Sequence, residues 1–392
     1  MEYVLFLHQK VYTVINDAKS HANGKRTGTQ QVNRQAKKRI ALIITTVVIF
    51  LLICAWGAFS VIMYNMNVNQ RFESYEPLMF HVDDFEGLQC TEYTFPSDKG
   101  QMLKGYWYSA GSNPKGIIVL AHGYGGGGQN SYMDIANYFA QNGYYVFAYD
   151  ATGNDQSEGE GVYGFPQGVI DLDHAISFVE ESGNFPDLPI GLIGHSWGAY
   201  SVCSVLTYHP EVKAVIACSG CNQSSDLFEV GGKAEAGDII YTMMPFVRLY
   251  ERIRFGDYAA NTAMDGFEAT EAAVMIAHSA DDDVVPVQYG YDLYHEKYRD
   301  NPRFRFVLFE DKGHSDFFVD RNDTYKDEFN SMFDKWLETL EYDYTANENK
   351  ERFTADRAEY IRSNLDRTRW SNRIDEELME MFLSFFNQYV IL

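Results

Sequence analysis

One stretch of the sequence decides the fold: Pro189-Ile190-Gly191-Leu192-Ile193-Gly194-His195-Ser196-Trp197-Gly198. An apolar run ends in a Gly-x-Ser-x-Gly pattern, and small or apolar residues follow it, which predicts a buried strand, a tight turn and the start of a helix. Gly194 and Gly198 leave room for the chain to pack around a serine held in a strained backbone conformation. The Ser196 hydroxyl would then project above a sheet at a helix N-terminus, a position suited to a nucleophile.

The pentapeptide alone is a weak signal. With average glycine and serine usage, roughly one chain in six of this length carries it by chance. The alternative interpretation is a glycine- and serine-rich turn without chemistry. The strand before the turn and the helix after it favour the functional interpretation, and the rest of the chain must supply the other catalytic groups.

Length and charge limit the possible classes of protein. The chain has 392 residues, of which 46% are hydrophobic, enough for one large domain with appendages. Its net charge of −23 argues against nucleic acid as a partner. The charge is unevenly spread, because residues 1–39 carry eight Lys and Arg against two acidic residues.

An uncharged run separates this basic segment from the acidic remainder. Ile40 to Tyr64 comprises 25 residues without a charge, which predicts one transmembrane helix with Trp56 and Tyr64 toward its far end. Lysines and arginines directly precede the run, so the positive-inside rule predicts a cell-membrane protein with residues 1–39 in the cytoplasm and the acidic part outside. A cleaved signal peptide is the alternative, but the run is too long and begins forty residues into the chain.

The cysteines indicate no disulfide framework. There are five, at Cys54, Cys90, Cys203, Cys218 and Cys221. The last two form a single C-x-x-C at the end of an expected strand, without the second pair or helix start that redox or metal function needs. We expect structural or incidental roles for them.

The rest of the chain alternates between strands and helices. Expected strands cover 91–95, 103–109, 116–121, 144–149, 189–195, 214–217, 272–278 and 304–309, and expected helices cover 131–142, 167–181, 287–298 and 325–341. The first two strands read as a hairpin, and the others are almost continuously apolar. This order predicts an α/β fold with a mostly parallel sheet covered on both faces.

The same reading predicts the division of the chain. Residues 1–39 form the basic segment, with a flexible linker over 23–35, and 40–64 form the transmembrane helix. A juxtamembrane connector over 65–87 leads to the α/β domain at 88–342. Within the domain, residues 219–271 interrupt the alternation and are expected to form a helical lid over the pocket. Residues 343–392 form a C-terminal helical extension with one apolar face, expected to dock on the domain.

A nucleophilic serine needs a base, an acid and an oxyanion site, and each has a candidate. His122-Gly123-Tyr124-Gly125-Gly126 follows an apolar strand, so the backbone N–H groups of Tyr124 and Trp197 are candidates for the oxyanion hole. His314 follows the last expected strand and is the candidate base. Asp281, Asp282 and Asp283 follow the strand before it, and only one of them can orient the imidazole.

With these candidates in the order Ser, Asp, His, the chain from about residue 88 to 340 resembles the α/β-hydrolase superfamily, most closely its lysophospholipase, monoglyceride-lipase and serine-aminopeptidase-like group. The resemblance rests on His122-Gly123-Tyr124-Gly125-Gly126, Gly194-His195-Ser196-Trp197-Gly198, the segment from His278 to Pro286, and Gly313-His314. Registering the family pattern on His278 and Pro286 selects Asp282 as the acid. Tyr149-Asp150 and the loop after it resemble a structural segment of the family, so Asp150 is not the acid, and Asp155 stands where glycine is usual.

The resemblance implies acyl transfer to Ser196, with His314 as base, Asp282 as its orienting acid, and no metal or cofactor. The leading hypothesis is a membrane-anchored serine esterase or lipase acting on a small-molecule acyl ester or lipid. The second is a peptidase of the aminopeptidase-like branch, for which Glu229, Glu235 or Asp238 could anchor a substrate amine. The third is an inactive hydrolase fold that serves as a binding module. The oligomeric state is left open.

Overall fold

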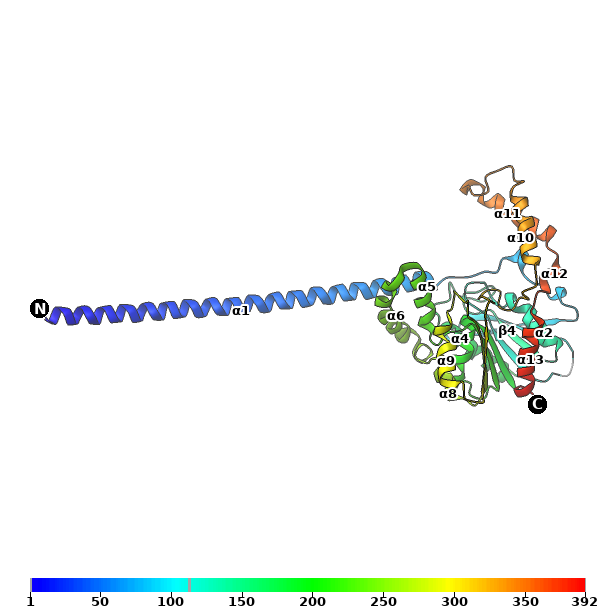
Figure 1. Cartoon of the computed structure of the whole chain (residues 1–392), viewed down its shortest axis with the longest axis horizontal. Helices are drawn as coiled ribbons and strands as arrows, with labels where there is room; N and C mark the ends of the chain where they lie inside the picture. The colour runs from blue at the N-terminus through cyan, green and yellow to red at the C-terminus, as the bar shows by residue number, and fades with distance from the viewer. Residues whose placement is uncertain (1, 112–113, 392) are drawn as a thin grey trace. The chain divides into compact units, whose positions relative to one another are not determined.

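The structure, a computed structural model, describes residues 2–111 and 114–391 and divides into two compact units, residues up to Phe59 and residues from Ser60 onward (Figure 1). Helix α1 (Glu2–Val68) makes up the first unit and its last turns belong to the second. The flexible linker predicted over 23–35 is helical instead, and it contains no proline that would interrupt the helix. Within the described residues, Asn33–Val68 is the one helical stretch apolar and long enough to cross a membrane.

The second unit is built on an eight-stranded sheet in the order β1-β2-β4-β3-β5-β6-β7-β8. The strands are β1 (Gln89–Pro96), β2 (Met102–Ser109), β3 (Ile117–Ala121), β4 (Tyr145–Tyr149), β5 (Ile190–His195), β6 (Ala214–Cys218), β7 (Ala273–Ser279) and β8 (Phe304–Phe309). Strands β1 and β2 pair antiparallel, β2 also pairs antiparallel with β4, and the remaining pairs are parallel. The predicted hairpin and parallel sheet are therefore confirmed.

Strand β5 lies at the centre of the sheet. Its six residues are all buried, as expected for an apolar strand between two parallel neighbours. Gly194 pairs with Ala121 at the end of β3, and His195 pairs with Cys218 at the end of β6. The carboxyl ends of β3, β5 and β6 therefore meet at Ser196, the next residue.

Helices cover both faces of this sheet. Helices α3 (Gln167–Glu181), α4 (Trp197–Ser204) and α9 (Tyr291–Tyr298) pack on one face, and α2 (Met133–Gln141) and α13 (Glu376–Tyr389) pack on the other. Figure 1 shows α13, in red, beside α2. The buried side chains of α13 are part of the main hydrophobic core: Leu378, Met379, Phe382, Leu383, Phe385 and Phe386.

The predicted boundary at residue 342 therefore does not separate the domain from an extension. Helix α10 (Tyr325–Leu337), expected to complete the domain, packs instead with α11 (Lys350–Asn364) and α12 (Arg367–Ser371). Trp336 stacks on Tyr360 of α11 with ring centroids 4.5 Å apart. Only Tyr325 and Phe329 of α10 are buried, so α10 offers less apolar surface to the sheet than α13 does.

The lid segment, residues 219–271, is helical as predicted. It contains α5 (Ser224–Ala236), α6 (Ile240–Phe255), α7 (Asp257–Ala260) and α8 (Ala263–Ala269). Helices α5 and α6 pack against each other, whereas α8 packs closely on α4. A Cβ on Gly266 of α8 would lie 2.0 Å from the carbonyl oxygen of Cys203, so the end of the segment is fixed to the body of the domain.

The end of α1 is buried in this unit. Ser60, Tyr64 and Val68 are four residues apart on one helix face and are all buried. The Tyr64 hydroxyl donates a hydrogen bond to the Glu251 carboxylate of α6 and accepts one from the Phe165 N–H at 3.1 Å. The prediction that Tyr64 lies toward the far end of a transmembrane helix is therefore wrong, because its ring packs against the lid. Residues 40–59 alone, at about 1.5 Å each, are long enough for the roughly 30 Å of a hydrocarbon core.

The connector predicted over 65–87 is an integral part of the domain. Phe72 forms a β-bridge with Asn154, and Ser74 donates from both its N–H and its hydroxyl to the Asp155 carboxylate at 2.6 and 2.7 Å. The same carboxylate accepts from the Gly128 N–H at 2.7 Å. Asp155, which departs from the family pattern, thus binds the connector to the glycine-rich loop.

Candidate active site

Ser196 occupies the sharp turn between β5 and α4. Its backbone has φ 55° and ψ −115°, a conformation that non-glycine residues adopt rarely and at a cost in energy. A Cβ on Gly194 would lie 2.3 Å from the Gly198 carbonyl oxygen, and one on Gly198 would lie 2.0 Å from the Ala121 carbonyl oxygen. Both flanking glycines are therefore required by close backbone contacts, as the sequence pattern predicts.

The structure brings the predicted base to this serine. His314 Nε2 lies 2.9 Å from Ser196 Oγ, and both side chains are almost fully buried. His314 comes from the loop after β8, whereas Ser196 follows β5. On the other side of the ring, His314 Nδ1 lies 2.8 Å from Asp282 Oδ2, so Nδ1–H donates to the carboxylate and Nε2 is left to accept from the serine hydroxyl.

Of the three adjacent aspartates, only Asp282 contacts His314. Asp282 Oδ1 accepts from the N–H groups of Val284 and Val285 at 3.0 and 2.8 Å. His278 Nε2 lies 3.3 Å from the second oxygen. Burial alone would raise the pKa of Asp282, but hydrogen bonds from His278 and His314 outweigh it and hold the pKa well below its usual range. Asp282 is therefore a stable anion beneath the imidazole.

The glycine-rich loop lies beside the serine turn. His122 fixes the start of the loop, because its Nδ1 lies 2.7 Å from the Gly123 carbonyl and its Nε2 accepts from the Ala151 N–H at 3.0 Å. The Tyr124 ring packs edge-on against Trp197, with centroids 5.9 Å apart. Its hydroxyl oxygen lies 3.0 and 2.9 Å from the carbonyl oxygens of Asn67 and Val68 at the end of α1, so its one proton is shared between these two acceptors. The side chain of Tyr124 is thus held against Trp197, whose own backbone N–H begins α4 and has no partner within the helix.

Two further residues of this site, Tyr132 and His195, are not among those predicted from the sequence. The Tyr132 hydroxyl accepts from the Gly123 N–H at 3.0 Å and donates to His195 Nδ1 at 2.9 Å. His195 Nε2 in turn lies 3.1 Å from the His314 carbonyl oxygen. Burial lowers the pKa of His195 to about 3, with a contribution from His314, so this ring stays neutral. The variable position of the Gly-x-Ser-x-Gly pattern was the signal available for His195, and none was available for Tyr132.

The predicted amine anchors do not lie at the triad. Glu229 pairs with Arg248 at 3.0 Å and accepts from the Tyr289 hydroxyl at 3.2 Å, while Glu235 and Asp238 are exposed. Asp150 is buried and accepts from the Gln129 N–H and the Tyr106 hydroxyl, which fits the structural role expected for it.

One cluster within the described residues has the composition of a metal site. Candidate ligand atoms of Glu180, His209 and Glu211 lie within 4.8 Å of one another. Both ring nitrogens of His209 are already hydrogen-bonded, one to Asp173 at 2.8 Å and one to Glu211 at 3.0 Å. The cluster is therefore satisfied as a hydrogen-bond network. All five cysteines are free thiols.

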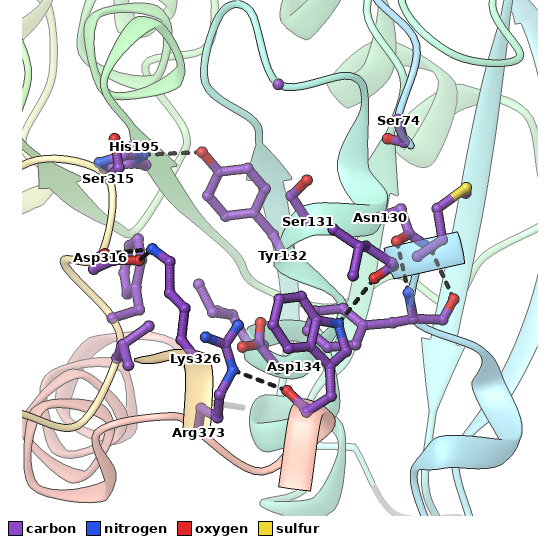
Figure 2. A pocket seen from close by; sticks show the side chains of 18 of the residues that line it. Ser74, Asn130, Ser131, Tyr132, Asp134, His195, Ser315, Asp316, Lys326 and Arg373 are labelled. Carbon is purple, nitrogen blue, oxygen red and sulfur yellow. Dashed lines mark hydrogen bonds and ion pairs between the residues drawn. The ribbon is translucent and has the colours of Figure 1, made fainter. Parts of the chain in front are cut away.

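A cavity of about 360 Å³ lies next to His195 (Figure 2). Ser196, Asp282 and His314 do not line it, although their neighbours His195 and Ser315 do. Its walls come from the connector, the start of α2, the loop after His314 and α12. Figure 2 shows Asp134 and Arg373 together at one end, and burial raises the pKa of Asp134 to about 6. The connector and the α10–α12 segment thus enclose a polar space next to the site.

Comparison with known proteins gives matches that cover part of this site. Residues 112–255, which include the glycine-rich loop, Ser196 and the first part of the lid but neither Asp282 nor His314, match the family described as "Serine aminopeptidase, S33". The chain is 25% identical over 263 residues to the uncharacterized protein YqkD of Bacillus subtilis, covering 66% of this chain and 84% of that protein. It is 36% identical over 95 residues to the monoglyceride lipase of Rattus norvegicus, covering 24% of this chain and 30% of the lipase.

A solved esterase of Pyrococcus furiosus is also similar, with a TM-score of 0.49 and 17% identity over 69% of this chain and 97% of the esterase. The family match, the lipase match and the sheet order agree on one fold. The chain has the α/β-hydrolase fold with a helical insertion over residues 219–271, and the matches support a hydrolase of either the esterase and lipase kind or the peptidase kind.

Proposed function

We propose that the chain is a serine hydrolase that cleaves carboxylic esters through an acyl-enzyme on Ser196. The observation that carries the proposal is the hydrogen-bonded line from Ser196 Oγ to His314 Nε2, 2.9 Å, and from His314 Nδ1 to Asp282 Oδ2, 2.8 Å. A nucleophile, a base and an orienting acid in this order can activate a serine hydroxyl.

In the proposed reaction, Ser196 Oγ attacks the ester carbonyl carbon while its proton passes to His314 Nε2. The N–H groups of Tyr124 and Trp197 stabilise the negative oxygen of the tetrahedral intermediate. The C–O bond to the alcohol then breaks, and His314 returns the proton to the departing oxygen. Water, deprotonated by His314, attacks the acyl-enzyme and releases the acid. Asp282 stabilises the imidazolium at both stages without taking its proton.

The acidic groups in the lid favour an ester substrate over a peptide, because none of them is both buried and free to bind a substrate amine. Glu229 is occupied by Arg248, and Glu235 and Asp238 project into solvent, so none of them offers a buried anchor for a substrate amine. The similarity to a monoglyceride lipase over 95 residues supports the same choice. Peptidase activity is the second candidate, because the matched family is described as a serine aminopeptidase.

We also propose that residues 40–59 anchor the chain in the cell membrane, with residues 1–39 in the cytoplasm and the hydrolase domain outside. Support comes from the basic residues that precede the apolar stretch and from the position of Ser60, the first residue of the folded unit. Protease added to intact cells should reach the domain and spare residues 1–39. Degradation of residues 1–39 with an intact domain would reverse the topology.

A fluorophosphonate probe tests the chemistry directly. The full chain should be labelled at Ser196, and Ser196→Ala should lose both label and turnover while keeping the thermal unfolding of the wild type. A folded wild type that takes no label would indicate an inactive binding module. Parallel assays with p-nitrophenyl acyl esters and aminoacyl anilides separate the two enzyme candidates, since turnover of anilides alone would exclude the esterase.

A further inference from the structure

The outer face of lid helix α6 carries an exposed apolar stripe. Ile239 at the start of the helix, Leu249 and Ile253 are 50%, 56% and 76% exposed, and partly buried Phe246 lies between them. At about 100° per residue these four side chains fall within roughly a quarter of the helix circumference. The opposite face of α6 is packed, with Met243, Met244 and Val247 buried, so the stripe is not needed to hold the helix in place.

Arg252 and Arg254 flank this stripe, whereas Arg248 lies on another side of the helix. All the exposed charges on α6 are arginines, although the chain as a whole has a net charge of −23. Arg248 pairs with Glu229, and Arg254 stacks over the Tyr163 and Tyr250 rings. Arg252 has no ion pair in the described part of the chain. An apolar stripe edged by cations is the pattern of a helix that lies in a membrane interface.

The packing of α6 fixes where this stripe can be. Tyr64 of α1 contacts α6 through Glu251 and through the Tyr250 ring, whose centroid is 5.8 Å away. The Tyr250 hydroxyl also donates to Asn65 Oδ1 at 2.9 Å. Tyr64 and Asn65 lie five and six residues after Phe59, the last residue of the proposed membrane span. Helix α6 is thus held by residues that follow the span within two helical turns, which limits how far α6 can lie from the bilayer surface.

We infer that α6 docks on the outer surface of the membrane in which the chain is anchored, with Ile239, Phe246, Leu249 and Ile253 inserted among the lipids and with Arg252 and Arg254 at anionic headgroups. The inference rests on the proposed membrane span and is independent of the proposed chemistry. It makes the lid a part of the membrane interface, so a substrate dissolved in the bilayer meets the lid before it meets bulk water.

Fluorescence quenching by lipids tests the docking on the full chain. Three variants each carry one environment-sensitive fluorophore on a single accessible cysteine. The first is labelled at native Cys54 and carries Cys90→Ser. The second and third carry Cys54→Ser and Cys90→Ser and are labelled at Ile253→Cys and at Glu296→Cys, respectively. The remaining cysteines are buried. Each variant is reconstituted in vesicles of phosphatidylcholine with about 30% phosphatidylglycerol. Part of the phosphatidylcholine carries a doxyl quencher near the top of its acyl chains.

Quenching at position 253 should exceed that at position 296, on the exposed surface of α9, by about threefold or more. Replacing phosphatidylglycerol by phosphatidylcholine should weaken the quenching at position 253, because the arginines then lack anionic headgroups to bind. Quenching at position 54 without quenching at position 253 would overturn the docking and leave the anchor standing. Loss of both would overturn the anchor itself. If position 253 is protected from aqueous iodide but is not quenched by the lipids, the apolar stripe of α6 is covered by another protein surface, such as a second copy of the chain, and the membrane docking is overturned.

Discussion

His195, the residue before the proposed nucleophile, donates its Nε2–H to the backbone carbonyl of His314 at 3.1 Å. Its other nitrogen accepts from Tyr132, which also receives the N–H of Gly123. One chain of hydrogen bonds therefore joins the glycine-rich loop, the serine turn and the loop that carries the proposed base. Because the pKa of His195 is lowered to about 3, the direction of these hydrogen bonds is fixed wherever such an enzyme works.

This chain predicts a positioning role for Tyr132. Tyr132→Phe removes the acceptor of the Gly123 N–H and the donor to His195, so kcat should fall about 10- to 100-fold while KM changes little. The loss should be equal between about pH 5 and 8, since His195 does not titrate there. Steady-state kinetics on a soluble ester measures it. Tyr138→Phe, in helix α2, which begins directly after Tyr132, and with its hydroxyl near solvent, is the control. An equal effect in both variants would remove the special role of Tyr132.

The contacts of Asp282 predict which aspartate matters. Asp282→Asn should lower kcat about 10⁴-fold, because an amide cannot hold His314 in the required tautomer or stabilise its charged form. The neighbouring Asp283 is exposed, so Asp283→Asn should keep wild-type turnover. Ester hydrolysis by the two purified variants decides the matter, and the opposite ranking would mean that the acid is misassigned.

Buried Glu251 predicts a pH dependence of stability. Burial raises its pKa to about 7 from the usual 4.5, although hydrogen bonds from Tyr64 and Ser224 oppose the rise. Since the folded state binds this proton more tightly than the unfolded state, the contribution is complete below about pH 4.5 and is lost as the pH rises to about 7, a change of up to about 3 kcal/mol.

Glu251→Gln should remove this part of the dependence, which denaturant unfolding at about pH 5 and pH 8 can measure. The wild type should lose more stability than the variant between the two conditions. Glu296→Gln, on the surface of α9, should behave like the wild type. A Glu251→Gln variant with an unchanged pH dependence would show that Glu251 is not protonated in the folded chain.

Two glycines predict opposite effects of the same substitution. Gly198→Ala would put a Cβ 2.0 Å from the Ala121 carbonyl oxygen, so it should cost about 3 kcal/mol or more and abolish activity. Gly231→Ala lies in α5 with no atom within 4 Å of the new Cβ, and should stabilise the chain by up to about 1 kcal/mol. Denaturant unfolding of both variants tests the pair. A tolerated Gly198→Ala would mean that the turn is looser than its contacts indicate.

The parts of this fold that could be predicted from the sequence are those with a local physical cause. Local sequence patterns identify the apolar strand at 190–195 and the glycines around Ser196. They also identify the loops that follow strands, and His314 and the three aspartates lie in such loops. Tyr132 could not be found in this way, because its role depends on the position of α2 relative to β5 and not on any residue near it in the chain.

The errors in the prediction also have physical causes. Helices α10 and α13 are both amphipathic, and amphipathicity does not specify which surface a helix covers. The sequence pattern therefore favours α10, the helix that follows the last strand directly, although α13 is the helix that covers the sheet. The uncharged run predicts a membrane span that ends at Tyr64. A tyrosine suits both a lipid interface and a protein core, so it does not show which of the two surrounds it. The sequence shows no boundary at Ser60, since the uncharged run continues through the point where α1 enters the domain.

The position of α13 has a consequence for biosynthesis. Its apolar side chains fill one face of a sheet whose strands all lie more than sixty residues earlier in the chain. Until residues 376–390 have left the ribosome and, in the proposed topology, crossed the membrane, strands β3, β5 and β6 keep an uncovered apolar face. Folding of the domain therefore cannot keep pace with translation, and the growing chain is exposed to aggregation until α13 arrives.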